Sequence, residues 1–320
     1  MTDAILEVED LRKSFGGIQA VDGATFEVES GTVTGLIGPN GAGKTTTFNL
    51  VSGFLDPDGG TVRFRGTDVQ ELMRPSPEEN RIWSVAAGVG IGTLGLAAAA
   101  GAGVSTVGML GAGAVGAGVG VGTYYGQERI KRVTDHRATR PYQMARHGLS
   151  RTFQITRELQ GMTVFENLLL APHDQRGEHL ANTWFRRNAV AQDERRVKER
   201  AREVMELLEL DHLQNELAGN LSGGQRKLLE LGRVLMTDPD LVLLDEPVAG
   251  VNPSLTQNIL ERIHTLREEG YTFLVVEHDM EVIMGLSDTI IVMHQGKKLT
   301  QGTPEEVQQD ERVVDAYLGG

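Results

Sequence analysis

GPNGAGKTT, at residues 38–46, decides the fold because it matches the pattern G-x-x-x-x-G-K-[ST] of a phosphate-binding loop. The apolar run at 33–37 before it predicts a buried strand, and residues 47–51 can continue it as a helix. In such a strand–loop–helix unit, glycines let backbone N–H groups approach a polyphosphate, and the helix start adds its positive dipole end. The residues expected to bind phosphates are Gly38, Asn40, Gly41, Ala42, Gly43, Lys44, Thr45 and Thr46.

A pair of carboxylates follows a second apolar run, at 241–244, which also predicts a buried strand. Asp245 and Glu246 stand at its carboxyl end, where ligands bind in an open α/β sheet. Asp245 can hold Mg2+ directly or through water, and Glu246 can polarise an attacking water. The Thr45 hydroxyl can also ligate Mg2+, and Lys44 can reach the outer phosphates. The two motifs together indicate nucleotide hydrolysis.

The order of predicted elements indicates an α/β fold. Residues 5–65 alternate strand-like runs with turns, whereas strands and helices alternate from residue 241 onward, as in a mostly parallel sheet. A charged amphipathic helix is expected at 193–210, where its apolar face indicates ordinary packing. The other expected strands are 5–8, 24–28, 61–64, 272–276 and 289–293, and the other expected helices are 254–268 and 279–285.

Composition and charge exclude several kinds of function. The net charge of -13 and the pI of about 5.1 disfavour non-specific binding to nucleic acid or anionic lipid. The chain has no cysteine, which excludes disulfides, thiolate metal sites and a thiol nucleophile. The N-terminus is polar and acidic and predicts no secretory signal, so the phosphate-binding loop is expected in the cytoplasm.

The segment LSGGQ, at 221–225, opens a predicted helix that runs to about Met236. Ser222 is a good helix N-cap by itself, and a capped helix start with two glycines is also an anion site. Together with the two motifs above, LSGGQ resembles the signature of the ATPase subunits of ABC transporters. In that family the signature of one subunit closes over ATP held by the phosphate loop of another, so the resemblance implies a head-to-tail homo- or heterodimer. The matching residues are Ser222, Gly223, Gly224 and Gln225.

The same resemblance assigns three further residues. Phe15 matches the aromatic that stacks on adenine, with core packing as the alternative. Gln154 matches the glutamine that senses Mg2+ and the attacking water. His278, after a predicted strand, matches the histidine that contacts the outer phosphate, with a hydrogen-bonded structural histidine as the alternative. The implied catalytic residues are therefore Glu246, His278 and Gln154, and the implied Mg2+ ligands are Thr45, Gln154 and Asp245.

Narrower patterns resemble the ATPases of branched-chain amino-acid uptake systems. They are RTFQ at 151–154, MTVFEN at 162–167, AGVNP at 249–253 and GTPEEV at 302–307. Asn252, where many ABC ATPases have Asp, is typical of that group, whereas Arg226 stands where many members have a second Gln. ATPases that extract lipopolysaccharide share much of the pattern. A soluble ABC ATPase of DNA repair or translation, and a module that binds ATP without hydrolysing it, are further alternatives.

The resemblance covers 1–69 and 140–320 and implies an assembly at the cytoplasmic face of the membrane. The expected cofactors are ATP and Mg2+. The expected partners are a second ATPase subunit, separate transmembrane permease subunits and, indirectly, a solute-binding protein; no nucleic acid is expected. The fold class is a P-loop NTPase core of ABC ATPase type with an antiparallel β portion. The expected domains are an ATP-binding core at 1–69 and 236–320, a helical subdomain at 140–235 and a Gly/Ala-rich insert at 70–139.

The insert has three open interpretations. Residues 82–127 contain no charged residue, and a membrane crossing needs about 20 residues, so two crossings fit. Trp83 and the pair Tyr124–Tyr125 lie near its ends, where interface aromatics are expected. The many glycines weaken any helix, so a flexible low-complexity loop or a soluble helical hairpin stands beside the membrane-associated hairpin.

Overall fold

The computed structural model describes residues 4–73, 141–152, 158–172 and 187–318. Gln154 and the insert prediction from residue 74 onward lie outside these described residues. All described residues belong to one unit, bounded by Met1–Met73 and Arg140–Gly320. Within the described ranges, no helix is both long enough and apolar enough to span a bilayer.

A six-stranded sheet forms the centre of this unit, in the order β10-β9-β3-β8-β7-β6. Its strands pair in parallel except β10, which is antiparallel to β9. Every residue of β3, β7 and β8 is buried, which explains why the sequence of these strands is largely apolar. The bounds are β3 Val33–Ile37, β6 Leu149–Arg151, β7 Leu241–Asp245, β8 Thr272–Val276, β9 Thr289–His294 and β10 Lys297–Gly302.

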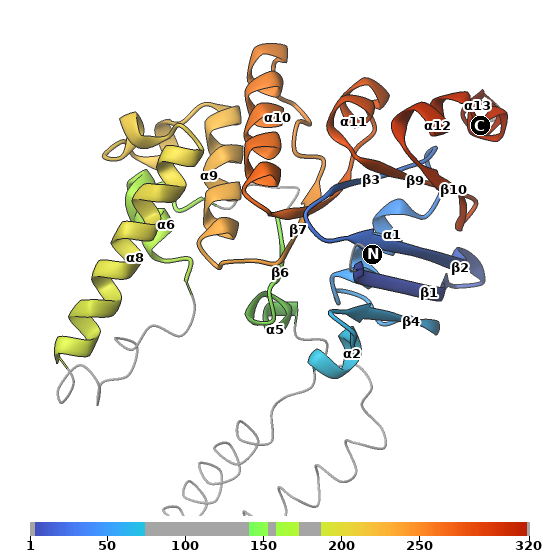
Figure 1. The fold of residues 1–320 in the computed structure, drawn as a ribbon, viewed down its shortest axis with the longest axis horizontal. Coiled ribbons are helices and arrows are strands. Elements are labelled where there is room, and N and C mark those ends of the chain that lie inside the picture. Colours follow the sequence, from blue (N-terminus) through green and yellow to red (C-terminus); the bar gives the residue numbers. More distant parts are fainter. Residues whose placement is uncertain (1–3, 74–140, 153–157, 173–186, 319–320) are drawn as a thin grey trace, which may run out of the picture. The chain divides into compact units, whose positions relative to one another are not determined.

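An antiparallel sheet, in the order β2-β1-β4-β5, lies beside it (Figure 1). The strands expected at 5–8, 24–28 and 61–64 are parts of β1, β2 and β4, which confirms the antiparallel portion of the fold. Helix α1, Lys44–Val51, shares a hydrophobic core with this sheet and with one face of the central sheet. The bounds are β1 Ala4–Phe15, β2 Ile18–Glu29, β4 Gly59–Phe64 and β5 Thr67–Asp68.

The other face of the central sheet shares a hydrophobic core with helices α9 to α11, and α8 packs outside it, against α6, α9 and α10 (Figure 1). In β7, Val242 and Leu244 belong to this helical core, whereas Leu241 and Leu243 belong to the other, as the two-residue period of a strand requires. The bounds of the helices on this side are α6 Val164–Leu169, α8 Arg187–Leu207, α9 Gly223–Leu235, α10 Pro253–Glu268 and α11 Met280–Leu286.

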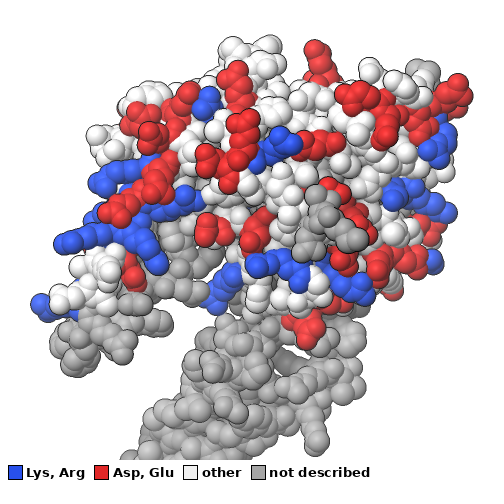
Figure 2. Space-filling model, in the orientation of Figure 1, with Lys and Arg blue, Asp and Glu red and all other residues white. Residues whose placement is uncertain are grey.

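Helix α8 confirms the amphipathic helix expected at 193–210, although it begins earlier and ends at Leu207. Val197, Ala201 and Val204 are buried as expected, and Lys and Arg side chains of its outer face are visible in Figure 2. The remaining helices are α2 Val69–Leu72, α5 Pro141–Arg146, α12 Pro304–Gln309 and α13 Glu311–Leu318, and short 3-10 turns span Asp211–Leu213 and Ala218–Asn220. Strand β6 lies within the segment 140–235 and still pairs with β7 of the central sheet.

The strand order of the central sheet brings the predicted catalytic motifs together. Strands β3, β8 and β7 are parallel neighbours, so their carboxyl ends meet at one edge of the sheet. The phosphate-binding loop follows β3, the pair Asp245–Glu246 ends β7, and His278 follows β8. Motifs that are more than 200 residues apart in the sequence therefore converge at this edge.

Candidate active site

The phosphate-binding loop runs from the end of β3 at Ile37 to the start of α1 at Lys44. Gly43 caps α1 in the left-handed conformation, with φ 96°. Any side chain there would be strained, and a Cβ would collide with the carbonyl of Ala20. The motif glycine at this position is therefore required by the loop's own shape.

Lys44 folds back across the loop. Its Nζ donates hydrogen bonds to the carbonyl oxygens of Gly38 at 2.6 Å and Pro39 at 3.1 Å. Burial lowers the pKa of Lys44, and the negative charge of Glu246 opposes this shift. The ammonium is thus held at the loop that would surround a polyphosphate, within electrostatic reach of the Glu246 carboxylate that follows β7.

Glu246 and His278, each expected to be catalytic, are in contact. His278 Nε2 lies 2.7 Å from Glu246 Oε1. The Glu246 backbone has φ 50°, a left-handed conformation that is rare for a side chain of this kind. Its N–H donates to the carbonyl of Val276 at 2.9 Å, which fixes the turn immediately after β7.

Asp245 pairs with a residue that the sequence did not single out for chemistry. Arg151, at the end of β6, places its Nη2 2.8 Å from Asp245 Oδ2; the Asp245 side chain is buried and the Arg151 side chain is 13% exposed. Its Nη1 donates to Asn49 Oδ1 at 2.6 Å and to Ser52 Oγ at 3.1 Å, both from the region of α1. The guanidinium carbon also lies 4.6 Å from the ring centroid of Phe48. Arg151 therefore joins β6, β7 and the helix of the phosphate loop.

Replacing Arg151 by Met is expected to lower stability by about 3 kcal/mol, because it leaves the buried Asp245 carboxylate without its counter-charge. Thermal unfolding should show a drop in Tm of roughly 5–15 °C. Arg63→Met is the matched control, because Arg63 pairs with Glu9 at 3.0 Å with more than a third of each side chain exposed, and such pairs contribute at most about 1 kcal/mol. An equal drop in Tm in the two variants would contradict a special role for the pair of Arg151 and Asp245.

The signature residues open helix α9. Ser222 is the N-cap: its Oγ accepts from Gln225 N at 3.3 Å, and Gln225 Oε1 accepts from Ser222 N at 2.9 Å. The two glycines differ. A Cβ on Gly224 would press against Leu255 of α10, whereas a Cβ on Gly223 would meet nothing within 4 Å. Gly224 is thus needed for helix packing, and Gly223 borders open space where a ligand could approach.

Phe15 ends β1 and is 47% exposed, so the alternative of core packing is not supported. Lys13 Nζ lies 5.7 Å from its ring centroid. An exposed ring leaves a face for a nucleotide base.

Replacing Phe15 by Ala is expected to weaken ATP binding about tenfold, near the lower end of the ~1–3 kcal/mol found for base stacking on aromatic rings. Equilibrium binding of ATP and of inorganic tripolyphosphate to the same variant would check this. The tripolyphosphate affinity should stay unchanged, since it has no base. A parallel loss for both ligands would show that Phe15 does not act through adenine.

The site can accommodate Mg2+ with help from phosphates. Among the residues that the structure describes, no group of three or more His, Asp or Glu is placed to hold a metal ion alone. Mg2+ commonly takes only one or two carboxylates, with phosphate oxygens and waters completing its shell. The hard oxygen donors of Thr45 and Asp245, at the same sheet edge, fit that chemistry.

Comparison with known protein families identifies the family to which this nucleotide site belongs. The model of the ABC transporter family matches residues 21–92 and 91–249. The chain belongs to the ABC transporter ATPases. A second model, of the branched-chain amino acid ATP-binding cassette transporter, matches residues 297–320 of this ABC ATPase.

Relatives along the whole length support the same assignment. This ABC ATPase is 34% identical to a probable branched-chain amino acid transport ATP-binding protein LivG of Archaeoglobus fulgidus, over 98% of this chain and 95% of the relative. It is also 34% identical to the high-affinity branched-chain amino acid transport ATP-binding protein BraF of Pseudomonas aeruginosa, over 100% and 99%. The ADP conformation of an ATP-binding cassette of an ABC transporter matches with a TM-score of 0.66 at 31% identity, covering 100% of both chains. The predicted fold class and family are thereby confirmed.

Proposed function

We propose that this ABC ATPase powers the import of branched-chain or related amino acids. The observation that supports this cargo is the match of residues 297–320 to a model specific for branched-chain amino acid transporters. Export of lipopolysaccharide, the alternative from the sequence, has less support, because the relatives from Archaeoglobus fulgidus and Pseudomonas aeruginosa are both named for branched-chain amino-acid transport.

In the proposed mechanism, the loop amides and Lys44 bind the phosphates of ATP, and Phe15 stacks on adenine. Glu246 orients and polarises the attacking water as it approaches the outer phosphate. His278, 2.7 Å from Glu246 Oε1, supports that phosphate and holds the carboxylate in place. Gln154 completes the catalytic set as a sequence-based proposal, since it lies outside the described residues.

Mg2+ supplies positive charge that neutralises the outer phosphates during transfer. Thr45 would hold it through its hydroxyl and Asp245 through a carboxylate oxygen. Because Arg151 binds Asp245 Oδ2, the other oxygen, Oδ1, is the one proposed for the metal. Gln154 is the third proposed ligand.

The ATP site is proposed to be completed in trans by a second ATPase subunit, either another copy of this chain or a different one. The start of α9, where Ser222 and Gly223 are exposed and Gln225 is partly exposed, would close over ATP bound to the partner, and Gly224 would keep α9 packed on α10. ATP binding closes the pair, and hydrolysis with release reopens it. Separate permease subunits would convert this motion into alternating access.

The assembly is proposed to lie at the cytoplasmic face of the membrane, attached through the permease and served indirectly by a solute-binding protein. The division of the chain into an ATP-binding core, a helical subdomain at 140–235 and an insert at 70–139 also remains a proposal. So does a membrane-associated hairpin at 82–127.

Phosphate release from the assembled complex tests the proposed function. Solute-binding protein loaded with leucine should stimulate ATP hydrolysis, whereas the same protein offered lysine should not. Hydrolysis that responds to neither amino acid, or to lipopolysaccharide instead, would contradict the proposed cargo.

A further inference from the structure

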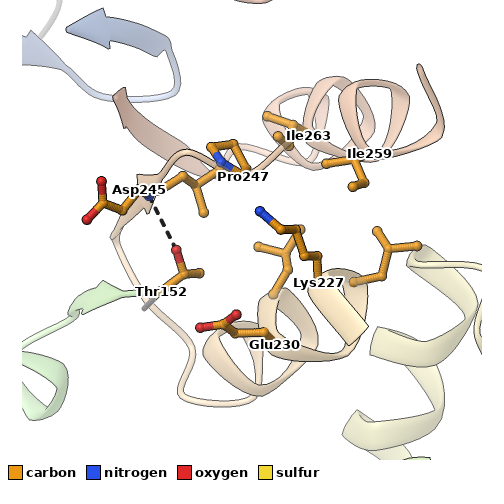
Figure 3. A pocket seen from close by; sticks show the side chains of 10 residues that line it. Thr152, Lys227, Glu230, Asp245, Pro247, Ile259 and Ile263 are labelled. Carbon is orange, nitrogen blue, oxygen red and sulfur yellow. Dashed lines mark hydrogen bonds between the residues drawn. The ribbon is translucent and has the colours of Figure 1, made fainter. Parts of the chain in front are cut away.

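A lysine of helix α9 reaches the catalytic turn. Lys227 extends toward the end of β7, beside Asp245 and Pro247 (Figure 3). Its Nζ donates a hydrogen bond to the main-chain carbonyl of Glu246 at 2.8 Å. Burial lowers the pKa of Lys227, with nearby carboxylates, Glu277 foremost, opposing the shift. A half-buried ammonium is costly to desolvate, so this contact is not explained by packing alone.

The turn that receives this hydrogen bond is conformationally unfavourable. Glu246 has φ 50°, and a left-handed backbone is disfavoured for any residue with a Cβ. The surrounding structure must therefore hold it in place. The N–H of Glu246 is fixed by Val276 O at 2.9 Å, and its carbonyl is fixed by Lys227.

A buried carboxylate secures the residues on either side. Glu277 is 4% exposed, and its Oε1 accepts from the backbone N–H of Val248 at 3.1 Å. Its Oε2 accepts from the N–H of His278 at 3.2 Å. Burial raises the pKa of Glu277, and these two N–H groups and Lys227 counter that shift. The turn after β7 is thus held from β8 by Glu277 and from α9 by Lys227.

We propose that Lys227 is a positioning residue for hydrolysis: it holds the main chain of Glu246 in the left-handed conformation that aims its carboxylate. The inference rests on the proposed role of Glu246. Lys227 lies five residues after the cap Ser222 in the same helix, or about 7.5 Å along its axis at 1.5 Å per residue. A shift of α9 when it engages nucleotide bound to the partner subunit would therefore be transmitted through Lys227 to Glu246 of the same chain.

The test compares Lys227→Met, Lys227→Arg and the control Lys198→Met in the assembled complex. Hydrogen bonds from charged donors are typically worth one to two orders of magnitude in an equilibrium. We therefore expect kcat to fall about 10- to 100-fold in Lys227→Met, with ATP affinity unchanged within about twofold. Lys227→Arg, which keeps a charged donor, should recover most of kcat. Lys198 is an exposed helical lysine, and its variant should match the wild type.

Nucleotide retention separates positioning from a folding defect. A complex that binds ATP but hydrolyses it slowly should retain more ATP after rapid gel filtration. The Lys227→Met complex should therefore retain more ATP than the wild-type complex. Wild-type kcat in Lys227→Met would overturn the inference. So would a joint loss of kcat, ATP affinity and Tm, or a failure of arginine to restore kcat. A wild-type complex that does not hydrolyse ATP would instead contradict the proposed function.

Discussion

Replacing Glu246 by Gln is expected to abolish ATP turnover while ATP still binds. The amide keeps the size of the side chain and can still accept a hydrogen bond from His278, but it cannot act as a base toward water. General-base groups typically contribute about 100- to 10,000-fold to a rate. Phosphate release from the assembled complex should therefore fall by at least about 100-fold, with the ATP dissociation constant unchanged within about twofold.

Glu281→Gln is the matched control, because Glu281 is an exposed glutamate in the first turn of α11, three residues after His278. It should hydrolyse ATP at the wild-type rate. Brisk hydrolysis in Glu246→Gln would defeat the assignment of the base. Loss of ATP binding in that variant would place Glu246 among the binding residues instead.

Replacing Lys44 by Ala is expected to abolish ATP binding at millimolar or lower concentrations, and hydrolysis with it. The ammonium lies over the phosphate-binding loop, and charge-assisted hydrogen bonds to phosphate are about twice as strong as neutral ones. Loss of two such bonds should weaken binding by on the order of 100-fold or more. Binding of a fluorescent ATP analogue, measured by titration, would check this.

Lys44→Arg should also bind ATP poorly, because a planar guanidinium does not fit a cradle built around a compact ammonium. Lys297→Ala, which removes a lysine that is 62% exposed, is the control. Tm should change little in Lys44→Ala, since the carbonyls of Gly38 and Pro39 can bind water. Wild-type ATP affinity in Lys44→Ala would mean that the loop does not bind nucleotide through this residue.

Local patterns predicted the elements that depend on near neighbours. The strands at 33–37 and 272–276 have the predicted bounds, and α9 begins at the predicted cap Ser222. Largely apolar runs and a capping box are local signals, because burial of a strand and satisfaction of a helix end are decided within a few residues. Strand β10 was not predicted, since most of its six residues are polar and none of them is buried.

Contacts between distant residues were not predictable from the same patterns. Arg151 was noted only as part of RTFQ, yet it pairs with Asp245, 94 residues away. Lys227 lies two residues beyond the signature, and nothing in the sequence connects it to the carbonyl of Glu246. Arg226 and Lys227, the two residues after the signature, are alike in charge and size, and only the position of α9 beside the turn after β7 selects Lys227.

The roles of the glycines in the signature also needed the structure. LSGGQ presents Gly223 and Gly224 as equivalent, but only Gly224 is buried against Leu255. The sequence pattern cannot tell a glycine needed for helix packing from one needed for ligand contact, because both positions require a small residue.

The most direct test of the central claim is uptake of radiolabelled leucine into vesicles containing the assembled complex, with its solute-binding protein on the outer side. ATP supplied to this chain's side of the membrane should drive leucine accumulation by the wild type. Glu246→Gln in this chain should abolish that accumulation. Accumulation that persists in Glu246→Gln, or a wild-type complex that hydrolyses ATP without taking up leucine, would contradict the account.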